Sequence, residues 1–350
     1  MGNFVFDLIG KNIVAALVIC IIPLVFILPY ALIAILGELK IGAWMQDRVG
    51  PMRTGWKGVL QPVAEVVKLL QKEDITPTIA NKPLFNLAPF IVFIGAFAAF
   101  AVLPFSEKFI PSGINLGLFF VFAVGSFAVI GIVMGGWASN NKYSLLGAMR
   151  SVAQIISYEL PAGMVFLSIA TIAGTLDMQT IILNQSGPIW NWYIFGGPQG
   201  GAIKFLFIPF FVILFIVYLI SSLAETNRTP FDIPEGESEI VAGYHTEYSG
   251  MKFAMFFMAE YANMYVVSAI IVILFLGGWS SPFGTSFMDG PIWGIFWMVG
   301  KAFFFVFVQI WLRWTLPRLR VDQLMYLGWK VLLPLSIACF MAIAFLAMIN

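Results

Sequence analysis

The chain has 350 residues, of which 60% are hydrophobic and 11% are charged, and its mean hydropathy is +0.92. A soluble domain carries about a quarter charged residues, so this composition indicates a polytopic membrane protein. The net charge of +1 provides no basic surface of the kind that nucleic-acid binding needs. Two cysteines in apolar runs, Cys20 and Cys339, and one histidine, His245, predict no disulfide framework, iron–sulfur cluster or bis-histidine haem in this chain.

Eight stretches of the chain are apolar over about the 20 residues that a helix needs to cross the hydrocarbon core. They predict an all-α fold, in which one membrane domain over residues 1–350 is a bundle of eight transmembrane helices. The expected helices cover residues 13–37, 85–103, 116–137, 153–174, 203–223, 257–276, 292–312 and 327–349.

The loops between these helices differ in charge. Fifteen of the 19 Lys and Arg residues lie in or directly beside loops 38–84, 138–152, 224–256 and 313–326. Inner loops retain Lys and Arg, so these loops are predicted to face inward and both termini to face outward. None of them contains a Walker A or G-x-G-x-x-G pattern. Energy or electrons must therefore come from a partner.

The first inner loop contains apolar residues at helical spacing between Leu60 and Leu70, with Gln61, Glu65 and Lys68 on the other face. This pattern predicts an amphipathic interfacial helix. Two interpretations remain open for it. The helix either lies on the membrane surface, or forms the wall of an opening through which a lipid-soluble molecule reaches the bundle.

The third inner loop is rich in carboxylates. Neighbouring carboxylates repel one another and burial disfavours their charged form, so some of them are expected to hold protons near neutral pH. A solvated acidic loop is the alternative, but the interleaved Pro230, Phe231 and Ile233 favour burial. The six acids are Glu225, Asp232, Glu235, Glu237, Glu239 and Glu247.

Several other ionisable residues fall within apolar spans or loops. Glu159 and Lys301 lie inside expected helices, where a charge either marks an ion pathway or belongs to an internal ion pair. His245 is either a proton relay or an interface residue. The last inner loop combines Arg318, Arg320 and Asp322, which fit either positive-inside retention or docking of an acidic partner surface.

Four inner segments, in order along the chain, resemble one family: the quinone-site membrane subunit of respiratory complex I, the proton-translocating NADH:quinone oxidoreductase. The matching motifs are QDRVGP at 46–51 with LQPVAE at 60–65, NNKYSLLGAMR at 140–150, ETNRTPFD at 225–232 with EYSGMKF at 247–253, and LPR at 316–318 with DQLM at 322–325. The family comprises the bacterial H subunits and their mitochondrial counterpart, subunit 1.

The resemblance implies a quinone chamber shared with a peripheral arm. By position, the quinone-binding residues would be Glu38, Arg48, Pro51, Arg228, Phe231 and Asp232. The residues resembling the family's proton link would be Glu159, Glu225, Glu235, Glu237, Glu239 and Glu247. At the end of the first helix the chain has Leu39, where many relatives have arginine, so no quinone-site role is carried over to residue 39.

The resemblance also implies partners. Quinone would be the substrate, with no cofactor in this chain. The terminal iron–sulfur cluster, FMN and NADH would belong to peripheral-arm subunits, and other membrane-arm subunits would flank the chain in a bacterial plasma membrane.

Three other functions remain open on the sequence. A related membrane-bound hydrogenase would use a similar subunit with a nickel–iron partner. A stand-alone ion-coupled transporter would act without a partner, although no internal repeat is visible in the sequence. A purely scaffolding subunit would bind no quinone.

Overall fold

The computed structural model describes residues 13–198, 203–234, 236–284 and 290–349. Within these residues the regular structure is helical, which confirms the all-α fold, and eight helices are long and apolar enough to cross a membrane. They are α2 (Ile13–Met45), α4 (Lys82–Phe100), α5 (Gly117–Ala138), α6 (Lys142–Ala173), α8 (Ile203–Glu225), α10 (Gly250–Phe275), α11 (Pro291–Thr315) and a C-terminal helix in which α12 (Val321–Tyr326) continues through a π-helical turn (Leu327–Leu332) into α13 (Leu333–Ile349).

Shorter helices lie in the connections. The predicted amphipathic helix forms as α3 (Gln61–Gln71). The other short elements are η1 (Trp56–Gly58), α7 (Met178–Asn184), η2 (Ile189–Asn191), η3 (Tyr193–Phe195), α9 (Glu237–Ile240) and η4 (Gly243–His245).

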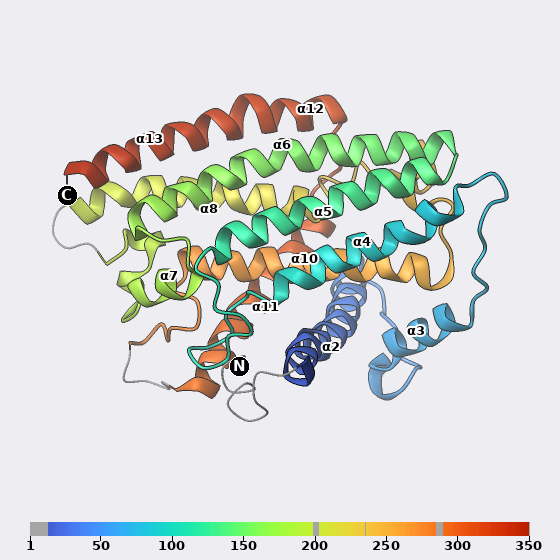
Figure 1. Cartoon of the computed structure of the whole chain (residues 1–350), viewed down its shortest axis with the longest axis horizontal. Coiled ribbons are helices and arrows are strands. Elements are labelled where there is room, and N and C mark those ends of the chain that lie inside the picture. The colour runs from blue at the N-terminus through green and yellow to red at the C-terminus, as the bar shows by residue number, and fades with distance from the viewer. Residues whose placement is uncertain (1–12, 199–202, 235, 285–289, 350) are drawn as a thin grey trace.

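The long helices form one bundle around α10 (Figure 1). Helix α6 packs against α5, α8 and α13, whereas α10 packs against α4, α8 and α11. The most apolar window of α10 is 78% buried, compared with 22–50% for the other spans. A helix that is hydrophobic all round belongs in the centre of a bundle, so α10 is the element around which the others are arranged.

Four of the described helices extend at least six residues beyond the predicted bounds: α2, α6, α10, which begins at Gly250 rather than 257, and the C-terminal helix, which begins at Val321 rather than 327. Helix α2 runs to Met45 rather than 37. Helix α6 begins at Lys142 rather than 153, so most of the expected loop 138–152 is helical. Asn141 caps α6, because its side-chain oxygen accepts a hydrogen bond from the Tyr143 amide at 2.9 Å. The first turns of α6 are amphipathic, with Ser144 buried and Lys142 exposed. A search for unbroken apolar residues misses such a start.

The third inner loop lies directly on α6 at a glycine. A Cβ atom on Gly147 would come within 2.6 Å of the Gly243 Cα, so only a residue without a side chain permits this approach. As a result η4, with the chain's single histidine, is held against the inner end of the bundle.

Candidate functional site

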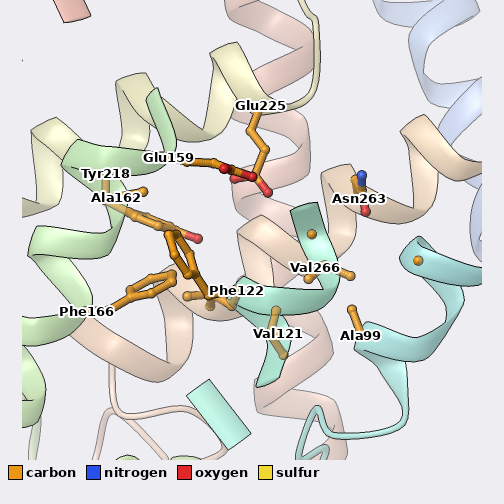
Figure 2. Close-up of a pocket in the computed structure, with 13 residues that line it drawn as sticks. Ala99, Val121, Phe122, Glu159, Ala162, Phe166, Tyr218, Glu225, Asn263 and Val266 are labelled. Carbon is orange, nitrogen blue, oxygen red and sulfur yellow. The ribbon is translucent and has the colours of Figure 1, made fainter. Parts of the chain in front are cut away.

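Glu159 and Glu225, predicted from distant parts of the sequence, share one cavity inside the bundle. Glu159 lies on α6 and Glu225 is the last residue of α8. Figure 2 shows their carboxylates pointing toward each other, with Tyr218 and Asn263 in the same cavity wall. The cavity has a volume of about 20 Å³, which holds about one water molecule. We call it the carboxylate cavity.

The chemistry of the carboxylate cavity follows from this crowding. Ser126 Oγ donates to Glu159 Oε1 at 3.5 Å, and Gly125 of α5 lies beside the Glu225 carboxylate. Two carboxylates that share a space of one water molecule repel each other when both are ionised, so the pair can hold a proton between them. The pair is therefore suited to accept and release protons inside the membrane.

Glu38 lies in a second cluster at the inner end of α2. Arg228 Nη1 is 3.1 Å from Glu38 Oε2, Tyr261 donates its hydroxyl to the same oxygen at 2.6 Å, and Arg313 also pairs with Glu38. Burial alone would lower the pKa of Arg228, but the Glu38 carboxylate holds this pKa above its usual range. The cluster therefore fixes two cations and one anion where α2, α10, α11 and the third inner loop meet.

Phe231 and Asp232 follow Arg228 and are also buried. The Phe231 ring lies edge-on to Tyr158, with ring centroids 5.2 Å apart. Asp232 Oδ2 accepts a hydrogen bond from Arg318 at 2.7 Å. Burial raises the pKa of Asp232, and the Arg318 guanidinium partly opposes that rise.

Of the other acids of the third inner loop, those whose side chains are described, Glu239 and Glu247, have separate partners. Glu239 is exposed and pairs with Arg150 at 2.6 Å. Glu247 accepts a hydrogen bond from Asn141 at 2.7 Å. Glu235 lies outside the described residues, and Glu237 begins α9. Among the residues described here, the predicted acidic set thus divides between the carboxylate cavity, the Arg318 pair and the loop surface.

A larger cavity separates α3 from the bundle. Its walls are α3, Ile35 of α2, the segment 241–250 and the first turns of α10, and its volume is about 460 Å³. We call it the α3 cavity. Residues Val63, Val67 and Leu70 of α3 are exposed on the other face of this helix, as expected for a helix whose apolar face lies against lipid.

None of the six residues expected near the quinone lines the α3 cavity, and Glu38, Arg228, Phe231 and Asp232 belong instead to the buried clusters described above. Arg48 is exposed in the loop that follows α2. Pro51 is half-buried, and its carbonyl accepts a hydrogen bond from the Lys40 ammonium at 2.7 Å.

The three residues expected to dock a partner differ in their surroundings. Arg320 and Asp322 are exposed at the start of α12, whereas the Arg318 guanidinium pairs with Asp232 within the chain.

Lys301 is bound by backbone carbonyls and an aromatic ring. Its ammonium donates to the carbonyl oxygens of Leu276, Gly278 and Ser280 at 2.8, 3.0 and 2.8 Å. It also lies 4.3 Å from the centre of the Trp192 ring. A cation that binds the free carbonyls after a helix C-terminus is stabilising, so Lys301 secures the end of α10.

Sequence reasoning missed several members of these clusters. Tyr261 binds Glu38, Tyr244 binds Glu260, and Asn263 faces the carboxylate cavity. The spacing of Glu260 and Asn263, three residues apart on α10, was the available signal, because residues three apart share one face of a helix.

In the described part of the chain no group of three His, Cys, Asp or Glu side chains could hold a metal ion.

These features define a polytopic helical membrane protein with carboxylates placed inside and at the inner border of its bundle. Residues 17–344 match the family model described as NADH dehydrogenase. The chain is 56% identical to the H subunit of NADH-quinone oxidoreductase from Chlorobaculum tepidum over 346 residues, which cover 96% of this chain and 92% of that relative.

Two further relatives carry the same name. The H subunits of Chlorobaculum parvum and Chlorobium luteolum are 55% and 56% identical to the chain over 337 residues each. These matches cover 93% and 94% of this chain, and 91% and 88% of the two relatives. The chain belongs to the NADH dehydrogenase family and is a multi-pass membrane subunit of NADH-quinone oxidoreductase, respiratory complex I. This membership confirms the resemblance and replaces the hydrogenase and transporter alternatives.

Proposed function

We propose that a long-tailed quinone enters the enzyme from the bilayer through the α3 cavity, and that this chain couples its reduction to proton movement. The observation that carries the proposal is the 460 Å³ cavity between the interfacial helix and the bundle. Its volume lies within the roughly 300–1,000 Å³ of small-molecule sites. Ile35, Phe253 and Phe257 supply apolar wall for a ring and the first part of a tail.

The attachment of α3 supports access from the membrane. At its C-terminal end, Asp74 pairs with Lys252 at 2.9 Å, and the Ile75 amide donates to Ser249 Oγ at 3.2 Å. These contacts fix the polar end of α3 to the start of α10, while the apolar face of α3 remains free for lipid. A quinone could therefore pass along α3 into the cavity, whose wall on this helix includes Glu65, Lys68 and Lys72.

The quinone head would move from the α3 cavity toward the inner loops. In this proposal the chamber is completed by a peripheral-arm subunit, and this chain contributes Glu38, Arg228, Phe231 and Asp232 from the buried clusters and Arg48 and Pro51 from the loop after α2. Arg318, Arg320 and Asp322 would help to dock that subunit. Leu39 has no proposed role in quinone binding.

Proton coupling would begin with the change in charge at the reduced quinone. Buried groups respond strongly to a nearby charge because the surrounding dielectric is low. In the carboxylate cavity, Glu225 and Glu159 would take up or release a proton in response to this charge. Glu235, Glu237, Glu239 and Glu247 would supply protons from the inner side.

The remaining parts of the reaction would belong to partners. Electrons would arrive from NADH through FMN and iron–sulfur clusters in the peripheral arm, and protons would continue to other membrane-arm subunits. The chain would lie in a bacterial plasma membrane with both termini outside, as its loop charges favour.

Photo-crosslinking of the assembled enzyme with a quinone analogue tests this proposal. We expect the label on peptides that contain residues 62–72 and 241–257, which form the α3 cavity. Val66→Trp would place a bulky ring in the α3 cavity and should lower labelling by about tenfold, since each 1.4 kcal/mol of lost affinity is a factor of ten.

Val67→Trp is the matched control, because Val67 is 45% exposed on the outer face of the same helix. It should label as the wild type does. Equal labelling of the Val66→Trp and wild-type enzymes, or label confined to other helices, would contradict access through the α3 cavity.

A further inference from the structure

His245, the single histidine of the chain, is buried in the wall of the α3 cavity. Its ring is enclosed by aromatic side chains. The centroids of the Phe256 and Phe253 rings lie 5.3 and 5.5 Å from the imidazole, both edge-on, and the Tyr244 ring lies at 3.9 Å. These contacts hold the imidazole in one orientation, so its polar atoms have a defined direction.

The Nε2 atom of the imidazole lies near Glu260. His245 Nε2 lies 3.7 Å from Glu260 Oε1, within ion-pair range, and the Tyr244 hydroxyl donates to the same carboxylate oxygen at 2.9 Å. The side chains of His245 and Glu260 are 3% and 13% exposed. Hydrogen bonds of working proton donors and acceptors are often longer in a resting structure than in the active complex. The pair is thus placed to exchange a proton.

The charges around the pair come from several elements. Arg228 of the third inner loop acts electrostatically on Glu260, as does the imidazole itself, and Glu260 in turn acts on Glu38 of α2. Across the α3 cavity, the charged side chains are Glu65, Lys68 and Lys72 of α3. His245 therefore lies between a cavity with charged groups on its far wall and a buried network of fixed charges.

Glu260 also has a continuation into the bundle. Asn263 follows it by three residues on α10 and lines the carboxylate cavity with Glu159 and Glu225 (Figure 2). Because residues three apart share a helix face, α10 presents Glu260 and Asn263 in sequence from the inner border toward the membrane interior. One face of the central helix thus carries both Glu260, beside His245, and Asn263, in the wall of the carboxylate cavity.

We propose that His245 carries protons between the α3 cavity and Glu260, a role that rests on the proposed function of that cavity. In the step, the Nε2–H bond of the imidazolium breaks and an O–H bond forms on Glu260 Oε1, which leaves a neutral imidazole and a carboxylic acid. The imidazole then takes one proton from a hydronium ion in the α3 cavity, which becomes water, and Glu260 returns to its carboxylate when its own proton moves on into the bundle. No electron is transferred, and one proton enters for each proton that leaves.

The test uses the assembled enzyme with His245→Asn and His245→Gln, which keep polar side chains that do not titrate. Quinone-linked turnover should fall roughly tenfold or more, and its dependence on pH should flatten, because neither replacement takes up a proton. Glu260→Gln should flatten it in the same way. The double variant His245→Asn/Glu260→Gln should lose little more than either single variant, because both act in one step.

Thr246→Val is the control, because Thr246 also lines the α3 cavity but does not titrate. It should keep the wild-type pH profile. A wild-type pH profile and pumping ratio in both His245 variants would overturn the relay, as would full additivity with Glu260→Gln.

Photo-labelling separates this result from the function of the α3 cavity. Labelling of the His245→Asn enzyme should match the wild type, which also shows that the variant is folded and assembled. If wild-type enzyme is not labelled in the α3 cavity, the proposed access route fails, whereas a labelled enzyme with an unchanged pH profile overturns only the role of His245.

Discussion

Glu38→Gln removes the negative charge that Arg228 and Arg313 share, and keeps the size of the side chain. Arg228 is 4% exposed, and within the described residues its Nε and Nη2 atoms have no hydrogen-bond partner. The substitution therefore leaves a buried guanidinium without its counter-charge. Removing one partner of a buried ion pair costs about 3–5 kcal/mol.

The lower end of that range applies to this cluster. The side chain of Arg313 is 25% exposed, so water can solvate it once the carboxylate is lost. We expect a loss of about 3 kcal/mol, or roughly 150-fold in the folding equilibrium. Tyr261→Phe, which removes only the 2.6 Å hydrogen bond to Glu38, should cost less, about 1.5 kcal/mol.

Thermal melting of the purified enzyme, followed by release of this chain from the complex, measures the difference. The midpoint should fall most for Glu38→Gln and less for Tyr261→Phe. Glu38→Gln/Arg228→Met should recover part of the loss, because the unpaired buried charge is gone. A Glu38→Gln enzyme that melts with the wild type, or a double variant that melts below it, would refute the reasoning.

Three further predictions follow from the other clusters. Glu159→Gln should lower proton pumping per quinone reduced, measured in proteoliposomes, and unchanged pumping would contradict its role. Lys301→Met should lower the melting midpoint through unsatisfied carbonyls, at about 1–3 kcal/mol each; a wild-type midpoint would contradict its structural role. Because burial raises the pKa of Asp232, its contribution to stability should be lost as pH rises above the ordinary value of about 3.9. The melting midpoint of the Arg318→Gln enzyme should fall more steeply with rising pH than that of the wild type. The same pH dependence in both enzymes would contradict the pairing of Arg318 with Asp232.

The sequence was sufficient for the fold class and the number of spans, because apolar length alone decides whether a helix can cross a bilayer. It placed the helix ends less well. The start of α6 depends on the Asn141 cap and on buried small residues such as Ser144, neither of which raises the local hydropathy. The amphipathic pattern of α3 was readable because its faces differ over three full turns.

The site was only partly readable from the sequence. Glu159 and Glu225 were found as charges in apolar surroundings, but their common cavity depends on how α6 and α8 pack. Glu38 and Arg228 are 190 positions apart and meet through tertiary structure alone. Tyr261 and Asn263 carry no charge, so composition could not distinguish them from other residues of the central helix.

Lys301 has one consequence for ion movement through the bundle. Its ammonium is bound to three carbonyls and a tryptophan ring, and therefore remains at the C-terminal end of α10. While it carries its proton, this ammonium is an electrostatic barrier to other cations within the low-dielectric region. We expect it to prevent proton leakage along α10 and α11 toward the side opposite the inner loops. Protons collected between the helices would then leave sideways, into whichever neighbouring subunit offers the next acceptor.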